Sequence, residues 1–149
     1  MNDYRLDFAQ KLETITIHSD DPDASEIIKS NLQHPFGVDI VIVATGNLKA
    51  LQDAVTFVRK GGTIVMFGVP SKGALINIDM SIVYSKEITI TTTYAASDLD
   101  TKSALELITS GKIDVKSLIT HKYSLEDSQK AFEHAKTGDN AMKIIIQDS

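Results

Sequence analysis

The chain has 149 residues, of which 42% are hydrophobic and 23% charged, with no cysteine and a formal net charge of −5. This length can bury the core of one domain, and the lack of cysteine excludes disulfides, thiolate zinc sites, iron–sulfur clusters and a cysteine nucleophile. The mild negative charge argues against a nucleic-acid surface. No apolar run is long enough to span a bilayer, and the polar first residues are unlike a signal peptide. A cytoplasmic α/β domain is therefore expected.

The first part of the sequence predicts a helix, a short strand and a second helix. Apolar residues near helical spacing predict a helix over residues 3–12, which begins with almost no room for a cap. Residues 14–17 alternate threonine and isoleucine, as a short strand does. Pro22 suits the first turn of a second helix, which runs to Leu32 and is stopped by residues 34–37, His-Pro-Phe-Gly.

The central part predicts buried strands separated by a helix. Residues 38–44 and 63–67 are apolar on both faces, as in strands that helices cover on two sides. Between them, residues 48–58 carry one apolar face, and the following 60–62, Lys-Gly-Gly, is interpreted as the C-terminal cap of that helix. Residues 88–94 alternate isoleucine and threonine at first, which predicts a strand at an edge or an interface.

The last part predicts two helices and a final strand. A helix is expected over residues 98–110, followed by a short extended piece over 113–119. Residues 124–127, Ser-Leu-Glu-Asp, resemble a capping box that leads a helix ending near Gly138. Residues 143–146 form the last strand. Strands that alternate with helices indicate a parallel sheet with right-handed crossovers.

The sequence contains no recognisable hydrolytic or metal-binding motif. His18, His34, His121 and His134 are scattered, without the spacing of metal ligands, so no zinc is expected on this chain. There is no GxSxG and no Walker A motif. A hydrolytic triad and a phosphate loop are therefore both unexpected.

Two of the buried strands end in small or backbone-exposing residues. The first strand ends in Ala44-Thr45-Gly46, and the second ends in Phe67-Gly68-Val69-Pro70. In open parallel sheets, ligands bind at the carboxyl ends of the strands. The two glycines would let a flat ligand approach the backbone; alternatively, they only form tight turns between strand and helix. The residues alone do not decide between these interpretations.

Several motifs along residues 38–146 occur in an order typical of one enzyme family. They are VDIVIVATG, a helix ending in KGG, FGVP, and the closing run SGKID, LITH, LEDSQKAFE and GDNAMKIII. In this order they resemble the C-terminal portion of the medium-chain, zinc-dependent alcohol dehydrogenase family, and within it the polyol, sugar and threonine dehydrogenases. Residues 3–12 also resemble the helix after the second strand of that family's cofactor domain.

The resemblance implies a truncated Rossmann-like fold, an α/β parallel sheet with flanking helices that lacks the family's first strand, first helix and second strand. The GxGxxG turn, the acid that holds the adenine ribose and the zinc-binding catalytic domain would all precede Met1. Residues 1–149 are thus expected to be a partial dinucleotide-binding domain, with 113–149 resembling the segment that returns to the catalytic domain. NAD or NADP is the implied cofactor, bound weakly or not at all by this chain.

The resemblance also assigns cofactor contacts to particular positions. The turn after the first buried strand would lie beside the adenosine and ribose, and the loop after the second would flank the nicotinamide. The end of the edge strand would approach the same ring. A basic residue of the first helix would lie near the ribose, and one of the last strand near the pyrophosphate. The turn beside the adenosine and ribose is Ala44, Thr45 and Gly46, and the loop beside the nicotinamide is Phe67, Gly68 and Val69. Thr93 and Tyr94 end the edge strand. Arg5 is the basic residue of the first helix, and Lys143 is that of the last strand.

Three functions remain open at this point. The first is the cofactor-binding fragment of an NAD(P)-linked alcohol or polyol dehydrogenase, inactive alone, whose N-terminal half could be encoded separately. The second is a non-enzymatic domain that keeps the family's oligomerising surface, and the third is a complete small enzyme of another chemistry. By resemblance, a homodimer or a higher homo-oligomer is expected through the edge strand Ile88–Thr93, with no nucleic-acid or membrane partner.

The missing strands carry one further expectation about the sheet. They would separate Thr14–Ile17 from Val38–Val43 in the family's strand order. Either Thr14–Ile17 closes up beside Val38–Val43, or another chain fills the place.

Overall fold

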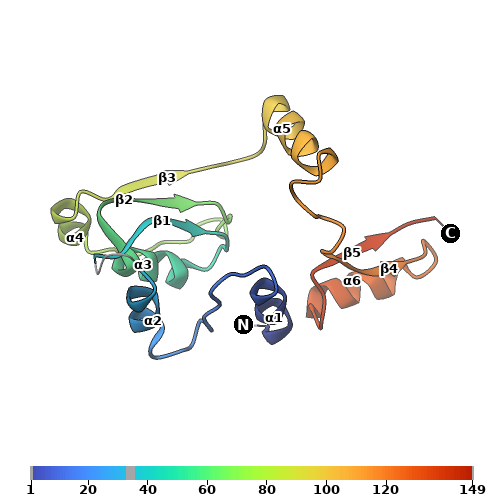
Figure 1. Cartoon of the computed structure of the whole chain (residues 1–149), viewed down its shortest axis with the longest axis horizontal. Helices are drawn as coiled ribbons and strands as arrows, with labels where there is room; N and C mark the ends of the chain where they lie inside the picture. Colours follow the sequence, from blue (N-terminus) through green and yellow to red (C-terminus); the bar gives the residue numbers. More distant parts are fainter. Residues whose placement is uncertain (1, 33–35, 149) are drawn as a thin grey trace. The chain divides into compact units, whose positions relative to one another are not determined.

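A computed structural model of the chain describes residues 2–32 and 36–148 (Figure 1). The chain divides into two compact units. The central unit comprises residues 22–95, and the terminal unit comprises residues 1–21 and 96–149. Each contains parallel strands with flanking helices, which confirms the predicted α/β class. No helix in the described ranges is long and apolar enough to cross a membrane.

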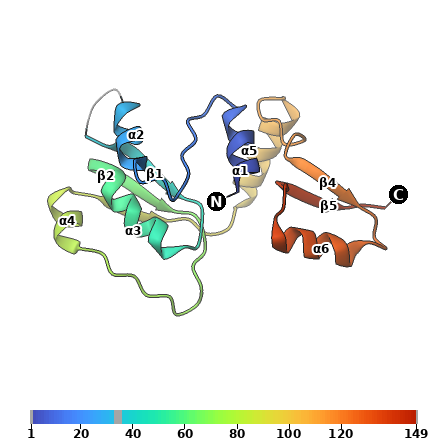
Figure 2. The ribbon, with the colours of Figure 1, turned by 90° about the horizontal axis from the view of Figure 1, so that it is seen from below.

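The central unit is a three-stranded parallel sheet in the order β1-β2-β3. A helix joins each strand to the next, and Figure 2 shows α3 lying along the sheet. The predicted stop after the second helix lies partly at residues 33–35, outside the described residues. The elements of the unit are α2 (Ala24–Ser30), β1 (Val38–Val43), α3 (Leu48–Phe57), β2 (Val58–Met66), α4 (Met80–Ser85) and β3 (Thr89–Thr92).

The core of this unit lies between α3 and one face of the sheet. Helix α3 begins at its N-cap Asn47, whose side chain accepts a hydrogen bond from the Lys49 amide. Its apolar face is buried against the strands, as the spacing of those residues predicts. The buried residues of the core are Val43, Leu51, Ala54, Val55, Val58, Ile64, Val83 and Ile88.

The interpretation of residues 60–62 as a C-terminal helix cap is wrong. Helix α3 ends at Phe57, and the next residue already begins β2, so Lys-Gly-Gly lies inside the strand. The β1–β2 register shifts at this point, with Val38 opposite Val58 but Ile40 opposite Thr63. The helix end is satisfied differently: Lys86 Nζ donates to the carbonyls of Val55 and Val58, both at 3.3 Å. A lysine distant in sequence therefore replaces the expected glycine cap.

Residues 14–17 do not form the predicted strand. An isolated segment has no ladder to join, and β-propensity by itself does not make a strand. In the described part of the sheet, β1 is an edge strand with β2 as its single neighbour. The expectation that Thr14–Ile17 closes up beside β1 is therefore wrong.

The terminal unit contains a two-stranded parallel sheet, β4-β5, connected through α6. Helix α6 lies along this pair (Figure 2). The predicted extended piece at 113–119 is instead mostly a turn, in which Asp114 Oδ1 accepts from the amides of Lys116 and Ser117. The elements of the unit are α1 (Asp3–Gln10), α5 (Asp98–Thr109), β4 (Ile119–Tyr123), α6 (Ser128–Thr137) and β5 (Lys143–Ile146).

Helix starts in this unit differ from the predicted ones. Helix α1 does have a cap, because Asn2 Oδ1 accepts from the Tyr4 amide at 3.0 Å. The predicted pairing of Ser124 with Asp127 forms, because the Asp127 amide donates to Ser124 Oγ at 3.3 Å. It lies in a turn directly before α6, however, because the N-cap of α6 is Asp127, whose side chain makes no cap hydrogen bond. A complete capping box occurs instead at the start of α5, between Ser97 and Asp100.

This capping box predicts a pH dependence of α5. The hydroxyl and amide of Ser97 donate to the Asp100 carboxylate and hold the pKa of Asp100 below its usual value. The cap is therefore intact above the usual carboxyl pKa, and we expect it to be lost as the pH falls through the lowered pKa. An NMR titration should show the amides of the first turn of α5 following Asp100. In Ser97→Ala, the pKa of Asp100 should return towards its usual value; an unchanged pKa would contradict this account.

Candidate functional site at the carboxyl edge of the sheet

The turns after β1 and β2 meet at one edge of the central sheet. The carbonyl of Val43, the last residue of β1, accepts two hydrogen bonds from the second turn. The amide of Phe67 donates to it at 3.1 Å and that of Gly68 at 2.8 Å. The structure thus brings the predicted residues 44–46 and 67–69 together, as the parallel pairing of their strands requires.

Two glycines allow this close approach. A Cβ on Gly68 would overlap the backbone of Thr45, and a Cβ on Gly46 would overlap the carbonyl of Val69. Each glycine therefore faces the backbone of the opposite turn. The packing of the two turns accounts for both glycines, so their presence does not by itself require a ligand.

Exposed apolar side chains flank the paired turns. Phe67 is 61% exposed and Val69 is 70% exposed. Beside them, a small hollow is lined by both turns and by the start of α3, and none of its lining residues is titratable. The hollow is only about 10 Å³ in volume, so a flat ring could contact this edge only through the exposed side chains and main-chain groups beside it. The residues that line the hollow supply no acid or base. The lining residues are Val43, Thr45, Gly46, Asn47, Leu48, Leu51, Met66, Gly68 and Pro70.

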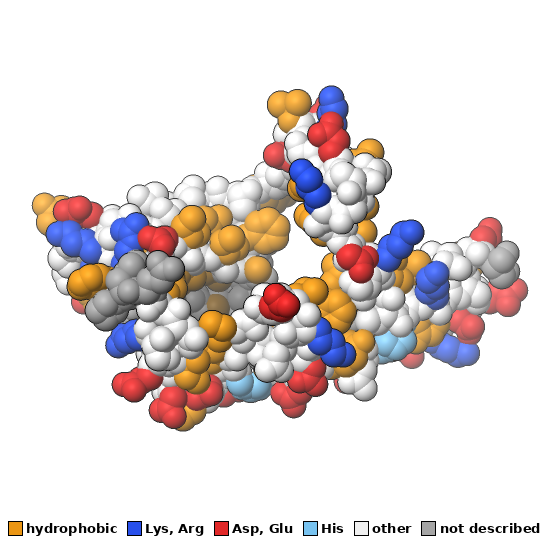
Figure 3. Space-filling view, in the orientation of Figure 1, with side chains coloured by type: hydrophobic (Ala, Val, Ile, Leu, Met, Phe, Trp, Pro, Cys, Tyr) orange, Lys and Arg blue, Asp and Glu red, His pale blue; other side chains and the backbone are white. Residues whose placement is uncertain are grey.

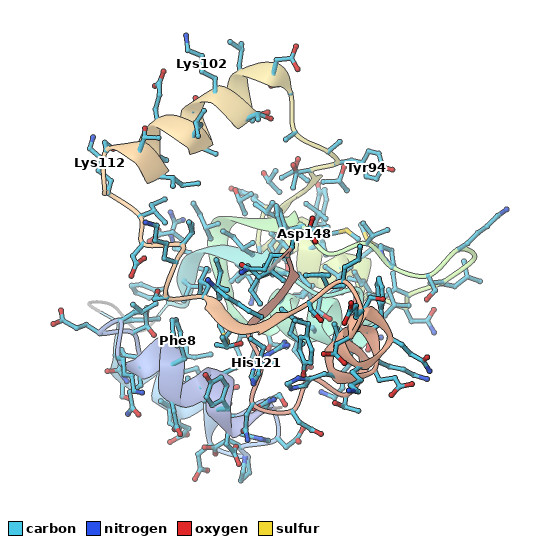
Figure 4. The ribbon with its side chains drawn as sticks, turned by 90° about the vertical axis from the view of Figure 1, so that its right-hand side faces the viewer. Phe8, Tyr94, Lys102, Lys112, His121 and Asp148 are labelled. Atoms are coloured by element: carbon cyan, nitrogen blue, oxygen red, sulfur yellow. The ribbon has the colours of Figure 1, made fainter. Side chains whose placement is uncertain are left out.

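Thr93 and Tyr94 follow β3 at the same edge of the sheet. The Thr93 amide donates to the Met66 carbonyl at 3.2 Å, which places Thr93 beside the residue that precedes Phe67. The side chain of Tyr94 is 85% exposed and projects away from the strands (Figure 4). Tyr94 is thus more exposed than Phe67 and Val69 at the same edge.

Arg5 and Lys143 belong to the terminal unit. Arg5 Nε donates to the Ala141 carbonyl at 3.2 Å, in the loop before β5. Lys143 begins β5, where its amide donates to the Leu118 carbonyl at 2.9 Å, and its side chain is exposed. The structure therefore groups Arg5 with the loop that precedes Lys143, and it groups the other eight predicted residues at the edge of the central sheet.

Sequence reasoning overlooked one polar residue in the hollow, Asn47. Its side chain caps α3, and its own amide donates to Thr45 Oγ1 at 3.2 Å. The signal was available, because an asparagine directly before an amphipathic helix is a typical N-cap. Asn47 fixes the geometry by which the first turn enters α3.

The described residues of the chain do not fit a zinc site. The described residues include no group of three or more His, Asp or Glu side chains that could hold a metal ion. Both ring nitrogens of His134 are engaged, with the Tyr123 hydroxyl at 2.8 Å and the Asp139 carbonyl at 2.7 Å. The neighbouring His121 contacts His134 edge to face and directs Nδ1 to Thr120 Oγ1. These histidines hold their own unit together.

A family model described as zinc-binding dehydrogenase matches residues 1–110. The chain belongs to the zinc-binding dehydrogenase family. The match covers the whole central unit with its paired turns, so the resemblance inferred from the ATG and FGVP motifs is confirmed.

Curated relatives agree with this assignment. The chain is 34% identical to sorbitol dehydrogenase from Bacillus subtilis over 144 residues, which are 95% of this chain and 40% of the relative. It is 31% identical to L-threonine 3-dehydrogenase from Bacillus velezensis, over 97% of this chain and 42% of the relative. The chain therefore spans about two fifths of the length of these relatives.

Solved structures show the same fold. An Escherichia coli oxidoreductase of unknown specificity matches the whole chain with a TM-score of 0.86 at 28% identity, over 42% of its own length. An E. coli dehydrogenase crystallised with NADH matches 97% of this chain and 42% of its own, with a TM-score of 0.81 at 17% identity. A Sinorhizobium meliloti zinc-binding dehydrogenase bound to NADP matches 95% of this chain and 42% of its own, with a TM-score of 0.82 at 21% identity. The last two likenesses concern the fold alone.

Proposed function

We propose that this chain is the cofactor-binding portion of an NAD(P)-linked alcohol or polyol dehydrogenase and that it is inactive by itself. One observation carries the proposal: the turns at residues 44–46 and 67–69 interlock at the carboxyl edge of a parallel sheet and leave Phe67 and Val69 exposed. That edge is where sheets of this type bind nucleotides. The bound cofactor would supply the hydride chemistry, while Phe67, Gly68 and Val69 flank its nicotinamide.

The proposed cofactor site is incomplete. The sequence contains no GxGxxG motif, whose amides and following helix N-terminus hold the pyrophosphate in dinucleotide-binding folds. The edge therefore offers contacts to the ring but lacks that phosphate turn. Zinc does not fit the described residues either, so any metal-assisted step would depend on residues outside the described part of the chain.

We expect the isolated chain to bind NAD(H) and NADP(H) no more tightly than roughly millimolar. The absent phosphate and ribose contacts are charge-assisted hydrogen bonds worth about 1.5–3 kcal/mol each. Isothermal titration calorimetry with each dinucleotide checks this expectation. Saturable micromolar binding to the chain alone would contradict the incomplete site.

The open edge of β1 supports the proposal that a further polypeptide segment packs beside this strand. Within the described sheet, no strand pairs with the outer edge of β1. On the face away from α3, Ile40 is 60% and Ile42 is 63% exposed. Figure 3 shows apolar side chains gathered over this unit. The proposal includes a polypeptide carrying the upstream part of the family fold, in the same longer protein or encoded separately, that covers this edge and face.

The opposite edge supports a second assembly contact. In the described residues β3 pairs with β2 alone, and all four of its residues are exposed. We propose that this edge pairs with its twofold mate in a homodimer. The same edge favours the second candidate function, a non-enzymatic oligomerising domain. A cofactor-binding portion should bind a dinucleotide at the turns, whereas a purely oligomerising domain should not, so a dinucleotide titration distinguishes the two candidate functions. The cytoplasmic location expected from the sequence stays a prediction.

A further inference from the structure

The loop between β2 and α4 contains an extended segment, residues 74–79, that belongs to no sheet. A tight turn precedes it, in which the Ala74 amide donates to the Ser71 carbonyl at 3.0 Å. The segment itself has neither a turn nor a bend, and its last residue, Asp79, has a φ of −69° and a ψ of 101°. Figure 2 shows the loop passing outside the strands on its way to α4. The segment thus has the conformation of a strand without a ladder.

Burial alternates along this segment as it does along a strand with one covered face. Ile76 and Ile78 are half-buried and pack against the core of the central unit, whereas Leu75 and Asn77 are exposed. The Leu75 side chain is 91% exposed. Packing of the two isoleucines therefore holds the segment along the core and fixes its inner face.

One flank of the segment carries unpaired backbone groups. Gln52 Nε2, from α3, donates to the Asn77 carbonyl at 2.9 Å, so the flank with this carbonyl faces α3. The backbone groups of successive strand residues point to opposite flanks, so those of Ile76 and Ile78 point away from α3. Within the described ranges, no residue forms a hydrogen bond with the amide or carbonyl of either isoleucine. This flank is equivalent to the open edge of a sheet.

We propose that this flank pairs with the same segment of a second copy of the chain, as two antiparallel strands around a twofold axis at Ile76. The two Ile76 residues exchange two hydrogen bonds, and each Ile78 amide donates to the Ala74 carbonyl of the other copy. Isoleucine opposite isoleucine is also a favourable cross-strand pair. One self-complementary edge therefore serves both copies.

The charges at the two ends of the segment favour a second copy as the partner. Lys72 is exposed in the turn before the segment, and Asp79 ends it. The Ser81 hydroxyl and amide donate to the Asp79 carboxylate at 2.6 and 2.9 Å and lower the pKa of Asp79, so this charge is present at neutral pH. Antiparallel pairing brings Lys72 of each copy to the end where Asp79 of the other lies, whereas parallel pairing brings like charges together.

This contact is separate from the proposed pairing through β3 and does not depend on cofactor binding. The segment has no sheet to support it and loses conformational freedom as it pairs, so we expect it to associate only at higher protein concentration than β3 requires. The Ile90→Pro chain, in which the β3 contact is removed, isolates the effect. In sedimentation it should be a monomer at low concentration and dimerise as the concentration rises.

Further substitutions in the Ile90→Pro chain test the contact. Ile76→Pro removes the outward donor and should weaken dimerisation about tenfold. Asn77→Pro is the matched control, because the amide that it removes faces α3, and Ile76→Ala controls for lost packing while it keeps the donor. Lys72→Glu leaves the backbone intact and should weaken dimerisation about fivefold at low salt and less at high salt. Lys29→Glu, the same charge change on α2, should have little effect.

Amide hydrogen exchange gives a second measurement that resolves single residues. In the Ile90→Pro chain, the amides of Ile76 and Ile78 should exchange about tenfold more slowly as the dimer forms. Those of Leu75 and Asn77, on the flank that faces α3, should change little. This difference between neighbouring residues reports which flank is paired.

Three results would overturn the inference. The first is an Ile90→Pro chain that stays monomeric at every concentration. The second is an equal loss of dimerisation in Ile76→Pro and Ile76→Ala, which would make packing rather than the backbone donor responsible. The third is a dimer in which the Ile76 and Ile78 amides gain no protection. Pairing through β3 is judged separately, by comparing the assembly of the wild type with that of Ile90→Pro.

Discussion

Gly68→Ala is expected to lower the free energy of unfolding by about 2–3 kcal/mol, as overpacking of a rigid site does. The added Cβ would overlap the backbone of Thr45, so no flexible side chain can move aside. The two turns must then separate, and the hydrogen bonds from Phe67 and Gly68 to the Val43 carbonyl weaken with them. Urea unfolding of the wild type and the variant measures the difference.

Gly73→Ala is the control for this substitution. Gly73 has a φ of 79°, and a Cβ added there would meet open space, with no heavy atom within 4 Å. That variant therefore carries only the left-handed backbone strain, about 1 kcal/mol. If Gly68→Ala proved no more destabilising than Gly73→Ala, the turns would not interlock as described.

Ile90→Pro is expected to convert the proposed dimer into a monomer. The Thr93 amide points to β2, and the direction of the N–H groups alternates along a strand, so the Ile90 amide points to the open edge. Proline at this position therefore removes a donor from the edge while the β2–β3 ladder keeps its own donors. Sedimentation should show a shift from dimer to monomer at protein concentrations where the wild type is dimeric.

Thr91→Pro and Ile90→Val are the matched variants. The first should weaken the folded unit itself, because the Thr91 amide points to β2, and circular dichroism and urea unfolding would show this loss. Ile90→Val keeps the donor and the β-branched shape, so it should remain dimeric. A wild-type chain that is already a monomer at high concentration would refute pairing through β3.

The periodicity of the sequence predicted the elements of the central unit, and local signals failed at their ends. The apolar face of α3 predicted its packing on the sheet, because burial of one face imposes helical spacing. The predicted C-terminus of α3 was wrong because Lys-Gly-Gly belongs to β2. The carbonyls at the helix end bind instead to Lys86, which is distant in sequence. Such a contact has no local signature.

Strand predictions depended on partners that a local pattern does not reveal. Thr14–Ile17 has the composition of a strand but no ladder, whereas Ile119–Tyr123 contains histidine and lysine and still pairs with β5. Pairing rather than propensity decided both cases. The turn at residues 113–119 arose from Asp114, whose carboxylate accepts two amides of the following residues.

The candidate site could be located from the sequence, but the reason for its glycines could not. The strand-end positions of Gly46 and Gly68 followed from the parallel topology. Their contact with the opposite turn depends on the β1–β2 register, which includes a shift that no residue pattern announced. Likewise, Arg5 was assigned to the ribose by resemblance, and its bond to Ala141 became visible only in the structure.

The central claim, that the paired turns bind a dinucleotide, is tested most directly by NMR titration of the chain with NADH. We expect the amide signals of Thr45, Gly46, Gly68 and Val69 to shift progressively into the millimolar range. Val69→Ser should diminish these shifts, while Leu75→Ser, which removes an apolar side chain that is 91% exposed elsewhere in the unit, should not. Shifts confined to other residues, with these four signals unmoved, would contradict dinucleotide binding at the paired turns.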